Sequence, residues 1–223
     1  MPSSSEFMQY LARGQGEGEQ LPSLNELSKA LGVGVARLRE QLEAAKAIGL
    51  VEVRPRTGIR RLAYSFLPAV RQSLSYAVSV DWSNFLAFAD LRNHIEAAYW
   101  DEAVRLLTAD DHAWLQELMR QAWEKLRGKP VQIPHAEHRR LHLRIYCRLG
   151  NPFVQGLLEA YWEMYEAVGL NLYSDYAYLV QVCTYHQQMV EAICQGAYED
   201  GFQALVKHRD LLYQRAQPVR AEE

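Results

Sequence analysis

Residues 21–61 read LPSLNELSKALGVGVARLREQLEAAKAIGLVEVRPRTGIRR. The spacing of their apolar residues is that of two consecutive helices followed by two short strands. Apolar residues first recur at the helical period, at Leu24, Leu27 and Leu31. Ser23 precedes this run as a candidate N-cap and Gly32 ends it, and the same period restarts at Leu38. Because the connection is so short, the pattern predicts a helix-turn-helix.

Basic residues lie in the second predicted helix and in the predicted hairpin, at positions where a polyanion could bind. Arg37 and Arg39 lie in the first turns of the second predicted helix, where cations oppose the helix macrodipole. The strands predicted over Leu50–Arg54 and Ile59–Leu62 enclose a turn, PRTG, whose Gly58 is expected to adopt a positive φ.

A helix with basic N-terminal residues beside a basic hairpin is typical of a winged DNA-binding protein, whose helix enters the major groove while the wing contacts the backbone or the minor groove. Arg54, Arg56, Arg60 and Arg61 of the hairpin are expected to have no acidic neighbour. The predicted DNA-binding residues are Arg37, Arg39, Arg54, Arg56, Thr57, Gly58 and Arg60. The alternative is a small helical domain with a solvated basic face.

The same stretch resembles the winged helix of GntR-type bacterial repressors. Their pattern is LPSE-x-x-LA-x-x-LGVSR-x-x-VREAL-x-x-L-x-x-x-GL, followed by a wing that contains glycine. The matching positions are Leu21, Pro22, Ser23, Leu27, Leu31, Gly32, Val33, Arg39, Glu40, Leu42, Gly49, Leu50 and Gly58. Gly34 and Val35 stand where the family has Ser-Arg, so a usual DNA-contacting arginine is missing and Arg37 is expected to substitute for it.

Composition places the chain among globular proteins. Its 223 residues are 49% apolar, which suffices for one large or two ordinary packed domains. The net charge is −3, yet residues 1–62 hold nine Lys or Arg against seven Asp or Glu. The three cysteines form no CxxC pair, which argues against a disulfide framework. The sequence shows neither an apolar run long enough for a membrane span nor a leader peptide. We therefore expect a cytoplasmic protein with no membrane association.

After residue 62 the pattern predicts about seven helices and almost no strand. The predicted fold is mainly α, with an N-terminal winged helix-turn-helix carrying a small β-hairpin and a C-terminal antiparallel bundle of six or seven helices. The predicted divisions are a DNA-binding domain at 1–62, a linker at 63–66 and an all-helical domain for ligand binding, metal binding and dimerisation at 67–223. This second half resembles the C-terminal domain of the FadR subfamily of GntR-type regulators, on five motif elements: Leu91-Arg92 followed by Glu96-Ala97-Ala98, Leu141-His142, Gly150-Asn151-Pro152, and the helices of His186 and His208.

Four histidines have spacings that suit one metal ion. His138 and His142 are four residues apart on one predicted helix, so their rings emerge on the same face. His186 and His208 lie at similar depths on two helices that meet at Gly196, which makes them nearly level if the helices are antiparallel. The alternative from spacing alone is four ordinary buried or surface histidines.

The FadR resemblance implies metal binding by an Asp-x-x-x-His pair and two later histidines. His142, His186 and His208 match these positions, while His138 stands where the family has Asp. Nitrogen donors favour a transition metal, with zinc or nickel expected, over Mg²⁺ or Ca²⁺, and loss of the carboxylate should weaken hard ions such as Mn²⁺.

The resemblance also implies that Arg92 lies in the effector cavity, where a guanidinium can bind a carboxylate with two hydrogen bonds. Tyr161, Trp162 and Tyr165 are expected to line the same cavity, and the expected effector is a small organic acid. The alternative for Arg92 is an ion pair with Glu96 on the helix surface.

Together these features predict a homodimeric transcription regulator, expected to act as a repressor, that binds double-stranded operator DNA and whose operator affinity is controlled by the effector. Two alternatives are a metal sensor, in which the ion itself is the effector, and a metal-dependent enzyme. Against the enzyme, Glu-x-x-His pairs of di-iron bundles are absent and no acidic residue is placed as a general base, so we expect no catalytic residues.

Overall fold

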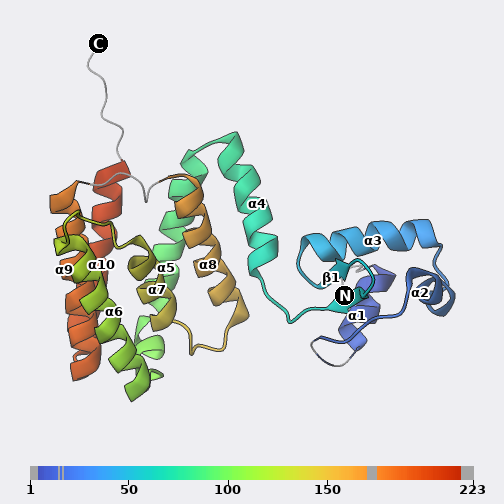
Figure 1. Ribbon diagram of the computed structural model, residues 1–223, viewed down its shortest axis with the longest axis horizontal. Coiled ribbons are helices and arrows are strands. Elements are labelled where there is room, and N and C mark those ends of the chain that lie inside the picture. Colours follow the sequence, from blue (N-terminus) through green and yellow to red (C-terminus); the bar gives the residue numbers. More distant parts are fainter. Residues whose placement is uncertain (1–4, 15, 17, 170–174, 217–223) are drawn as a thin grey trace, which may run out of the picture. The chain divides into compact units, whose positions relative to one another are not determined.

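The computed structural model describes residues 5–14, 16, 18–169 and 175–216 (Figure 1). The chain divides into two compact units, Met1–Ser73 and Leu74–Glu223. The division falls within helix α4 (Leu67–Val80). The linker predicted at 63–66 precedes this helix, and that boundary stays a prediction.

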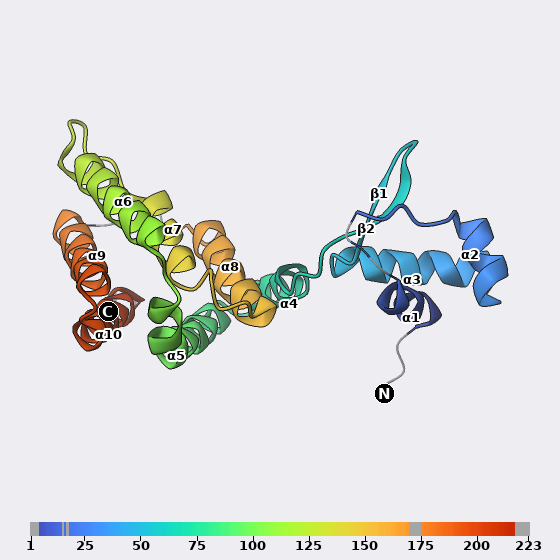
Figure 2. The same ribbon diagram turned by 90° about the horizontal axis from the view of Figure 1, so that it is seen from below.

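The first unit is built on three helices and one hairpin. They are α1 (Glu6–Arg13), α2 (Leu24–Leu31), α3 (Val35–Ala47), β1 (Val51–Arg54) and β2 (Gly58–Arg61). Ser23 and Glu26 form a capping box at the start of α2, and Gly32 closes that helix with a φ of 66°. The strands are antiparallel, with Val51 opposite Arg61, and the hairpin projects beyond α3 (Figure 2).

Apolar side chains from all of these elements share one core. Its buried members are Phe7, Leu11, Leu21, Leu27, Val33, Leu38, Leu42, Ala45, Val51 and Ile59. The helix-turn-helix and the wing are therefore one packed unit, as the apolar spacing of residues 21–61 predicts.

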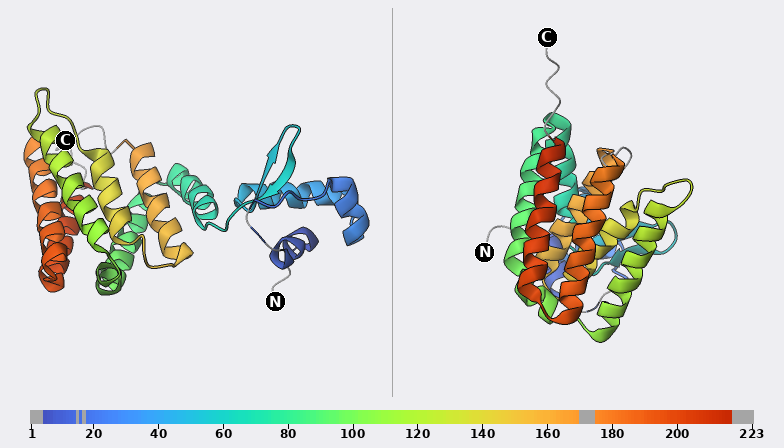
Figure 3. Two further views of the ribbon diagram at one scale, coloured as in Figure 1. Left: turned by 60° about the horizontal axis from the view of Figure 1, so that its bottom comes forward. Right: turned by 90° about the vertical axis from the view of Figure 1, so that its left-hand side faces the viewer.

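Every regular element in the described part of the second unit is a helix. After α4 come α5 (Ser83–Arg105), α6 (Ala109–Arg127), α7 (His135–Ile145), α8 (Pro152–Ala167), α9 (Tyr176–Gln195) and α10 (Tyr198–Ala216). Helices α9 and α10 form an antiparallel hairpin around Gly196, whose φ is 72°, and lie side by side in Figure 3. The core gathers α5, α6, α7, α8, α9 and α10 around residues such as Trp100, Leu115 and Ile193.

The predicted fold class is confirmed: a winged helix-turn-helix is followed by a helical bundle. No described helix combines the length and apolarity that crossing a lipid bilayer requires.

Candidate metal centre and DNA-binding surface

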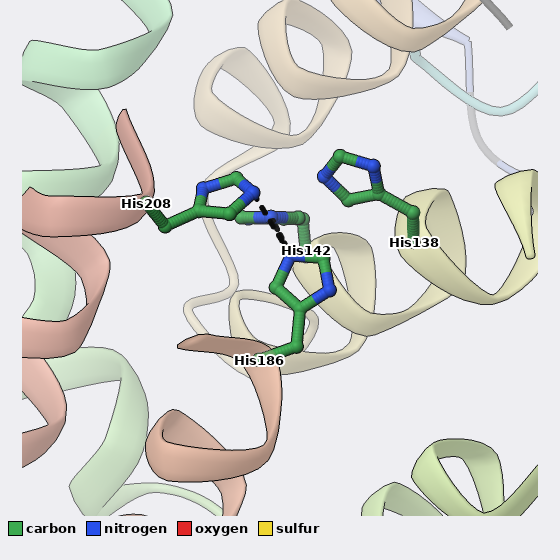
Figure 4. Close-up of side chains that lie close together, drawn as sticks. All are labelled: His138, His142, His186 and His208. Carbon is green, nitrogen blue, oxygen red and sulfur yellow. Dashed lines mark hydrogen bonds between the residues drawn. The ribbon is translucent and has the colours of Figure 1, made fainter. Parts of the chain in front are cut away.

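Four histidine rings meet inside the second unit (Figure 4). Helix α7 supplies His138 and His142, α9 supplies His186 and α10 supplies His208. Each ring offers one nitrogen, and the four nitrogens lie within 4.8 Å of one another. The structure thus brings together all four histidines that the sequence singled out.

Local structure explains the convergence. One helical turn separates His138 from His142, so both rings leave the same face of α7. The turn at Gly196 folds α10 back along α9, which sets His186 and His208 beside each other with their Nε2 atoms 3.0 Å apart.

Among His142, His186 and His208, the two separations between ring nitrogens that involve His186 are those of ligands to one ion. His186 Nε2 lies 3.3 Å from His142 Nε2 and 3.0 Å from His208 Nε2. Two imidazole nitrogens about 2.0–2.1 Å from a shared ion, at angles of about 90–110°, are about 2.9–3.4 Å apart. One ring proton can serve only one of the two contacts at His186, whereas a cation takes lone pairs from all three rings.

A buried carboxylate orients one of these rings. Glu96 Oε1 lies 3.1 Å from His142 Nδ1, and a carboxylate only accepts hydrogen bonds, so Nδ1 carries the proton and Nε2 keeps its lone pair. Arg92 Nη2 is 3.0 Å from the same oxygen, and both Arg92 and Glu96 are almost fully buried. Burial works to raise the pKa of Glu96, but Arg92 and then His142 outweigh it, so that pKa is lowered.

The histidines are held neutral. Burial lowers the pKa of His138, His186 and His208 well below the ordinary 6.5, and the repulsion that a protonated ring would meet from Arg92 and from any other protonated ring lowers it further. Burial also lowers the pKa of His142, with Glu96 working in the opposite direction. Neutral imidazole is the metal-binding form, so the donor set fits a transition metal at neutral pH.

Aromatic rings close one side of the cluster. The Trp162 ring centroid lies 4.6 Å from that of His138 and 5.4 Å from that of His142. The guanidinium carbon of Arg92 lies 4.7 Å from the ring centroid of Tyr161. Trp162 therefore packs against both the cluster and Arg92, and Tyr161 packs against Arg92.

The residues predicted to bind an effector are not all in one cavity. Tyr165 lines a cavity with His138 and His186, while Arg92 lines a smaller void with His208. Arg92 does pair with Glu96, as the alternative had it, but this pair is buried and not on the helix surface.

The predicted DNA-binding residues are all exposed on the first unit: Arg37, Arg39, Arg54, Arg56, Thr57, Gly58 and Arg60. Helix α3 begins after Gly34, which provides no side-chain cap, and its first turn has no acidic residue. The open N–H groups at that end carry positive partial charge, which suits a phosphate.

The wing differs from the expectation that its arginines have no acidic neighbour. Arg54 pairs with Glu52 at 3.0 Å, and Arg61 is mostly buried, lying 3.3 Å from Glu19. In the predicted recognition helix, Arg37 is paired with Glu6 of α1 at 2.8 Å. These contacts depend on the packing of α1 and the pairing of the strands, which local spacing does not specify.

The tip of the wing has the conformation of a tight turn. Gly58 has a φ of 75°, as predicted, and Arg56 also has a positive φ, of 70°. Non-glycine residues adopt this region at a cost of about 1–2 kcal/mol. Gln20 Nε2 donates to the carbonyl of Thr57 and ties the tip to the preceding segment.

Sequence reasoning missed two buried acidic residues. From the sequence, Glu96 is expected only as a motif residue and as the alternative ion-pair partner of Arg92, and Glu137 is assigned no role beside the histidines. Both are buried, and Glu137 lines the same cavity as His138. The available signal was an acidic residue on an otherwise apolar helical stripe, which is rarely buried without a partner.

A winged helix-turn-helix followed by a helical bundle with a buried donor cluster defines a DNA-binding regulator with a separate sensory domain. Comparisons with known protein families lead to the same class of protein. Residues 13–60 match the model of the bacterial regulatory proteins of the gntR family, and residues 87–211 match the FCD domain. The chain belongs to the gntR family of bacterial regulatory proteins and carries an FCD domain.

Solved structures show the same fold. A GntR protein of Streptococcus agalactiae is 19% identical, with a TM-score of 0.69, over 94% of this chain and 96% of that one. Lar of Listeria monocytogenes, which controls expression of the agr system and mediates virulence, is 15% identical with a TM-score of 0.50, over 95% and 96%. A search among curated protein sequences found no match. Members of this family are transcription regulators, so the alternative of a metal-dependent enzyme is excluded.

Proposed function

We propose that this regulator binds its operator as a homodimer, and that a small organic acid bound beside a metal-holding histidine cluster controls its operator affinity. It would work in the cytoplasm, as a repressor of the FadR subfamily. The observation that carries the proposal is the convergence of four neutral histidines, three of them buried and His138 half-buried, whose ring nitrogens lie within 4.8 Å in the domain that follows the winged helix.

The DNA contacts would come from the N-terminal end of α3 and from the wing, through Arg37, Arg39, Arg54, Arg56, Thr57, Gly58 and Arg60. Arg39 is exposed and has no ion-pair partner among the described residues, whereas Arg37 must leave Glu6 to reach DNA. Arg39 is therefore the strongest candidate for a base contact in the major groove.

Replacing Arg39 by alanine should weaken operator binding by about 1–3 kcal/mol, about 5- to 150-fold, and relax specificity at one base pair. Fluorescence anisotropy with a duplex from the protein's own upstream region measures this change. Lys46→Ala is the matched control, because Lys46 lies in the last turn of α3 and already pairs with Glu43. Equal losses in the two variants would remove Arg39 from the base contacts.

The metal would be held by His138, His142, His186 and His208, with Glu96 orienting His142. An ion there supplies positive charge and coordination positions for oxygen ligands. Four nitrogen donors favour Zn²⁺ or Ni²⁺ over Mn²⁺ or Mg²⁺.

Support for an anionic effector comes from the charge around the cluster. Arg92 is 3% exposed, its Nε has no hydrogen-bond acceptor among the described residues, and its positive charge acts on all four histidines. Tyr161 packs on Arg92, and Tyr165 lines the cavity beside His138 and His186. A small carboxylate would be attracted to this region, with these three residues contributing to its binding.

Dimerisation is supported by apolar surface on the second unit. Tyr76 is 74% and Val80 is 69% exposed on α4, and Trp82 and Leu91 near the start of α5 are also exposed. A second copy covering this surface would provide the two winged units that half-sites about 34 Å apart require. Sedimentation equilibrium tests this: a monomer mass at micromolar concentration would contradict it.

The switch is tested by measuring operator affinity with zinc, with a chelator and with small organic acids. We expect an acid to change operator affinity about 5- to 150-fold in zinc-loaded protein, the usual range of allosteric coupling. Release of the operator by chelator alone would instead favour the metal sensor. If an acid raises thermal stability without changing operator affinity, the proposed switch is wrong.

A further inference from the structure

A cavity of about 30 Å³ adjoins the histidine cluster at His138 and His186. That volume holds one or two water molecules, or the small end of a bound ligand. Most of its lining is apolar, from residues such as Met119, Ile133 and Leu179, so its few polar groups decide which ligands fit.

Glu137 is the acidic group in this lining. It is 5% exposed, and its Oε1 accepts a hydrogen bond from Lys125 Nζ at 2.7 Å. Its Oε2 is buried and has no hydrogen-bond donor among the described residues. A buried acceptor without a donor costs about 1–3 kcal/mol, which a ligand hydroxyl would recover.

The groups that line the cavity differ in charge. Burial, and after it the negative charge of Glu137, raises the pKa of the Cys183 thiol to about 11. His138 and His186 belong to the cluster on which the positive charge of Arg92 acts. A ligand with negative charge at just one of its two ends matches this arrangement.

We infer that Glu137 determines effector specificity: it accepts a hydrogen bond from a hydroxyl group of a small monocarboxylic acid and rejects a second carboxylate. The inference rests on the proposed function, because it places the hydroxyl end of the effector in this cavity and its carboxylate toward the histidines. A hydroxyl fits better than a second cation because Lys125 already partly neutralises Glu137. A second carboxylate would be a like charge beside Glu137 and would lose affinity.

Three acids with three carbons test this inference: propionate, 3-hydroxypropionate and malonate, each titrated calorimetrically into full-length, zinc-supplemented protein. The natural chain should bind 3-hydroxypropionate at least about tenfold more tightly than either of the others, as expected for a site with a buried unpaired acceptor. Glu137→Gln should lower the preference for 3-hydroxypropionate over malonate by about tenfold or more, because it removes the like charge.

Two further variants separate specificity from folding. Lys125→Gln should strengthen the rejection of malonate, because it leaves the charge of Glu137 without its cation. Lys125 is 38% exposed, so this change is mild for the fold. Glu102→Gln, at an exposed position of α5, removes the same charge as Glu137→Gln and should change no preference.

The outcomes distinguish this inference from the proposed function. If the acids bind and Glu137→Gln leaves their order unchanged, Glu137 is not the specificity residue, while the proposed function stands. If none of the three binds the natural chain, the inference is overturned for small acids. If Glu137→Gln changes the order but no acid changes operator affinity, the inference holds and the proposed switch fails.

Discussion

Replacing His186 by alanine should abolish stoichiometric metal binding and most of the thermal stabilisation that added zinc confers. His186 Nε2 contacts both His142 Nε2 and His208 Nε2, so its loss removes the ring between the other two. Zinc at about a thousand times its Kd stabilises the natural protein by about 4 kcal/mol. A variant that binds about 100-fold more weakly would gain only about 1.4 kcal/mol at the same concentration.

Elemental analysis after gel filtration, and thermal unfolding with and without zinc, measure these effects. His94→Ala is the matched control, because His94 lies on α5 of the same unit with its side chain 69% exposed. Glu96→Gln should fall between them, since removal of a group that orients a metal-binding histidine typically costs about 10- to 100-fold in affinity. Metal content near zero in the natural protein even after zinc addition would refute the site.

The second large effect is expected at Asp111, which joins α6 to the end of α7. Its side chain is fully buried and accepts hydrogen bonds from the backbone N–H and the hydroxyl of Thr108, both at 2.8 Å. Arg148 Nε donates to the same carboxylate, and Arg144 Nη2 lies 2.6 Å from its other oxygen. Asp111→Asn should lower the free energy of unfolding by about 1–3 kcal/mol, because it removes the charge with which Arg144 and Arg148 pair and weakens their hydrogen bonds, while both arginines stay partly solvated.

The effect should depend on pH in a defined direction. Burial opposes ionisation of Asp111, but the hydrogen bonds from Arg148 and Thr108 and the charge of Arg144 outweigh it, so its pKa is lowered. A lowered carboxyl pKa contributes stability above about pH 4, the ordinary value for Asp, and that contribution is lost as the pH falls through the folded-state pKa. The difference between the two proteins should be largest near neutrality and shrink in acid.

Denaturant unfolding of both proteins between pH 3 and about pH 7 checks this prediction. Asp110→Asn is the control: Asp110 is the exposed neighbour in the first turn of α6, where loss of one charge costs about 0.3–1 kcal/mol through the helix dipole. A destabilisation by Asp111→Asn no larger than that of Asp110→Asn would contradict the role assigned to the buried carboxylate.

Sequence reasoning predicted the elements better than their contacts. The capping residue Ser23, the helix end at Gly32 and the positive φ of Gly58 follow from local backbone chemistry and are present in the structure. The spacing of His138 and His142 is also local, because it depends only on the helical period. The level placement of His186 and His208 was predictable because a single glycine turn joins their helices, whereas their convergence with the α7 pair was implied by the family resemblance.

Contacts between distant helices were not predictable in this way. Glu96 and His142 are 46 residues apart, and Asp111 and Arg148 are 37 residues apart. The same holds for Arg37, whose pairing with Glu6 depends on how α1 packs against α3. The periodicity of apolar residues shows which face of each helix is buried, but not which other helix packs against that face.

The amino-acid sequence by itself determined the winged helix, the helical second half, the basic N-terminal end of α3, the shared face of His138 and His142 and the level placement of His186 and His208, because each depends on spacing along one helix or across one turn. The meeting of these two pairs of histidines is a contact between separate helices, which the family resemblance implied and spacing did not. Only the tertiary structure decided that Glu96 orients His142, that Arg92 and Tyr165 line different cavities, and that Glu137 lies beside His138 with an unpaired oxygen. The reason is physical: hydrogen bonds and ion pairs act over a few ångströms, and only packing brings residues from separate helices within that range.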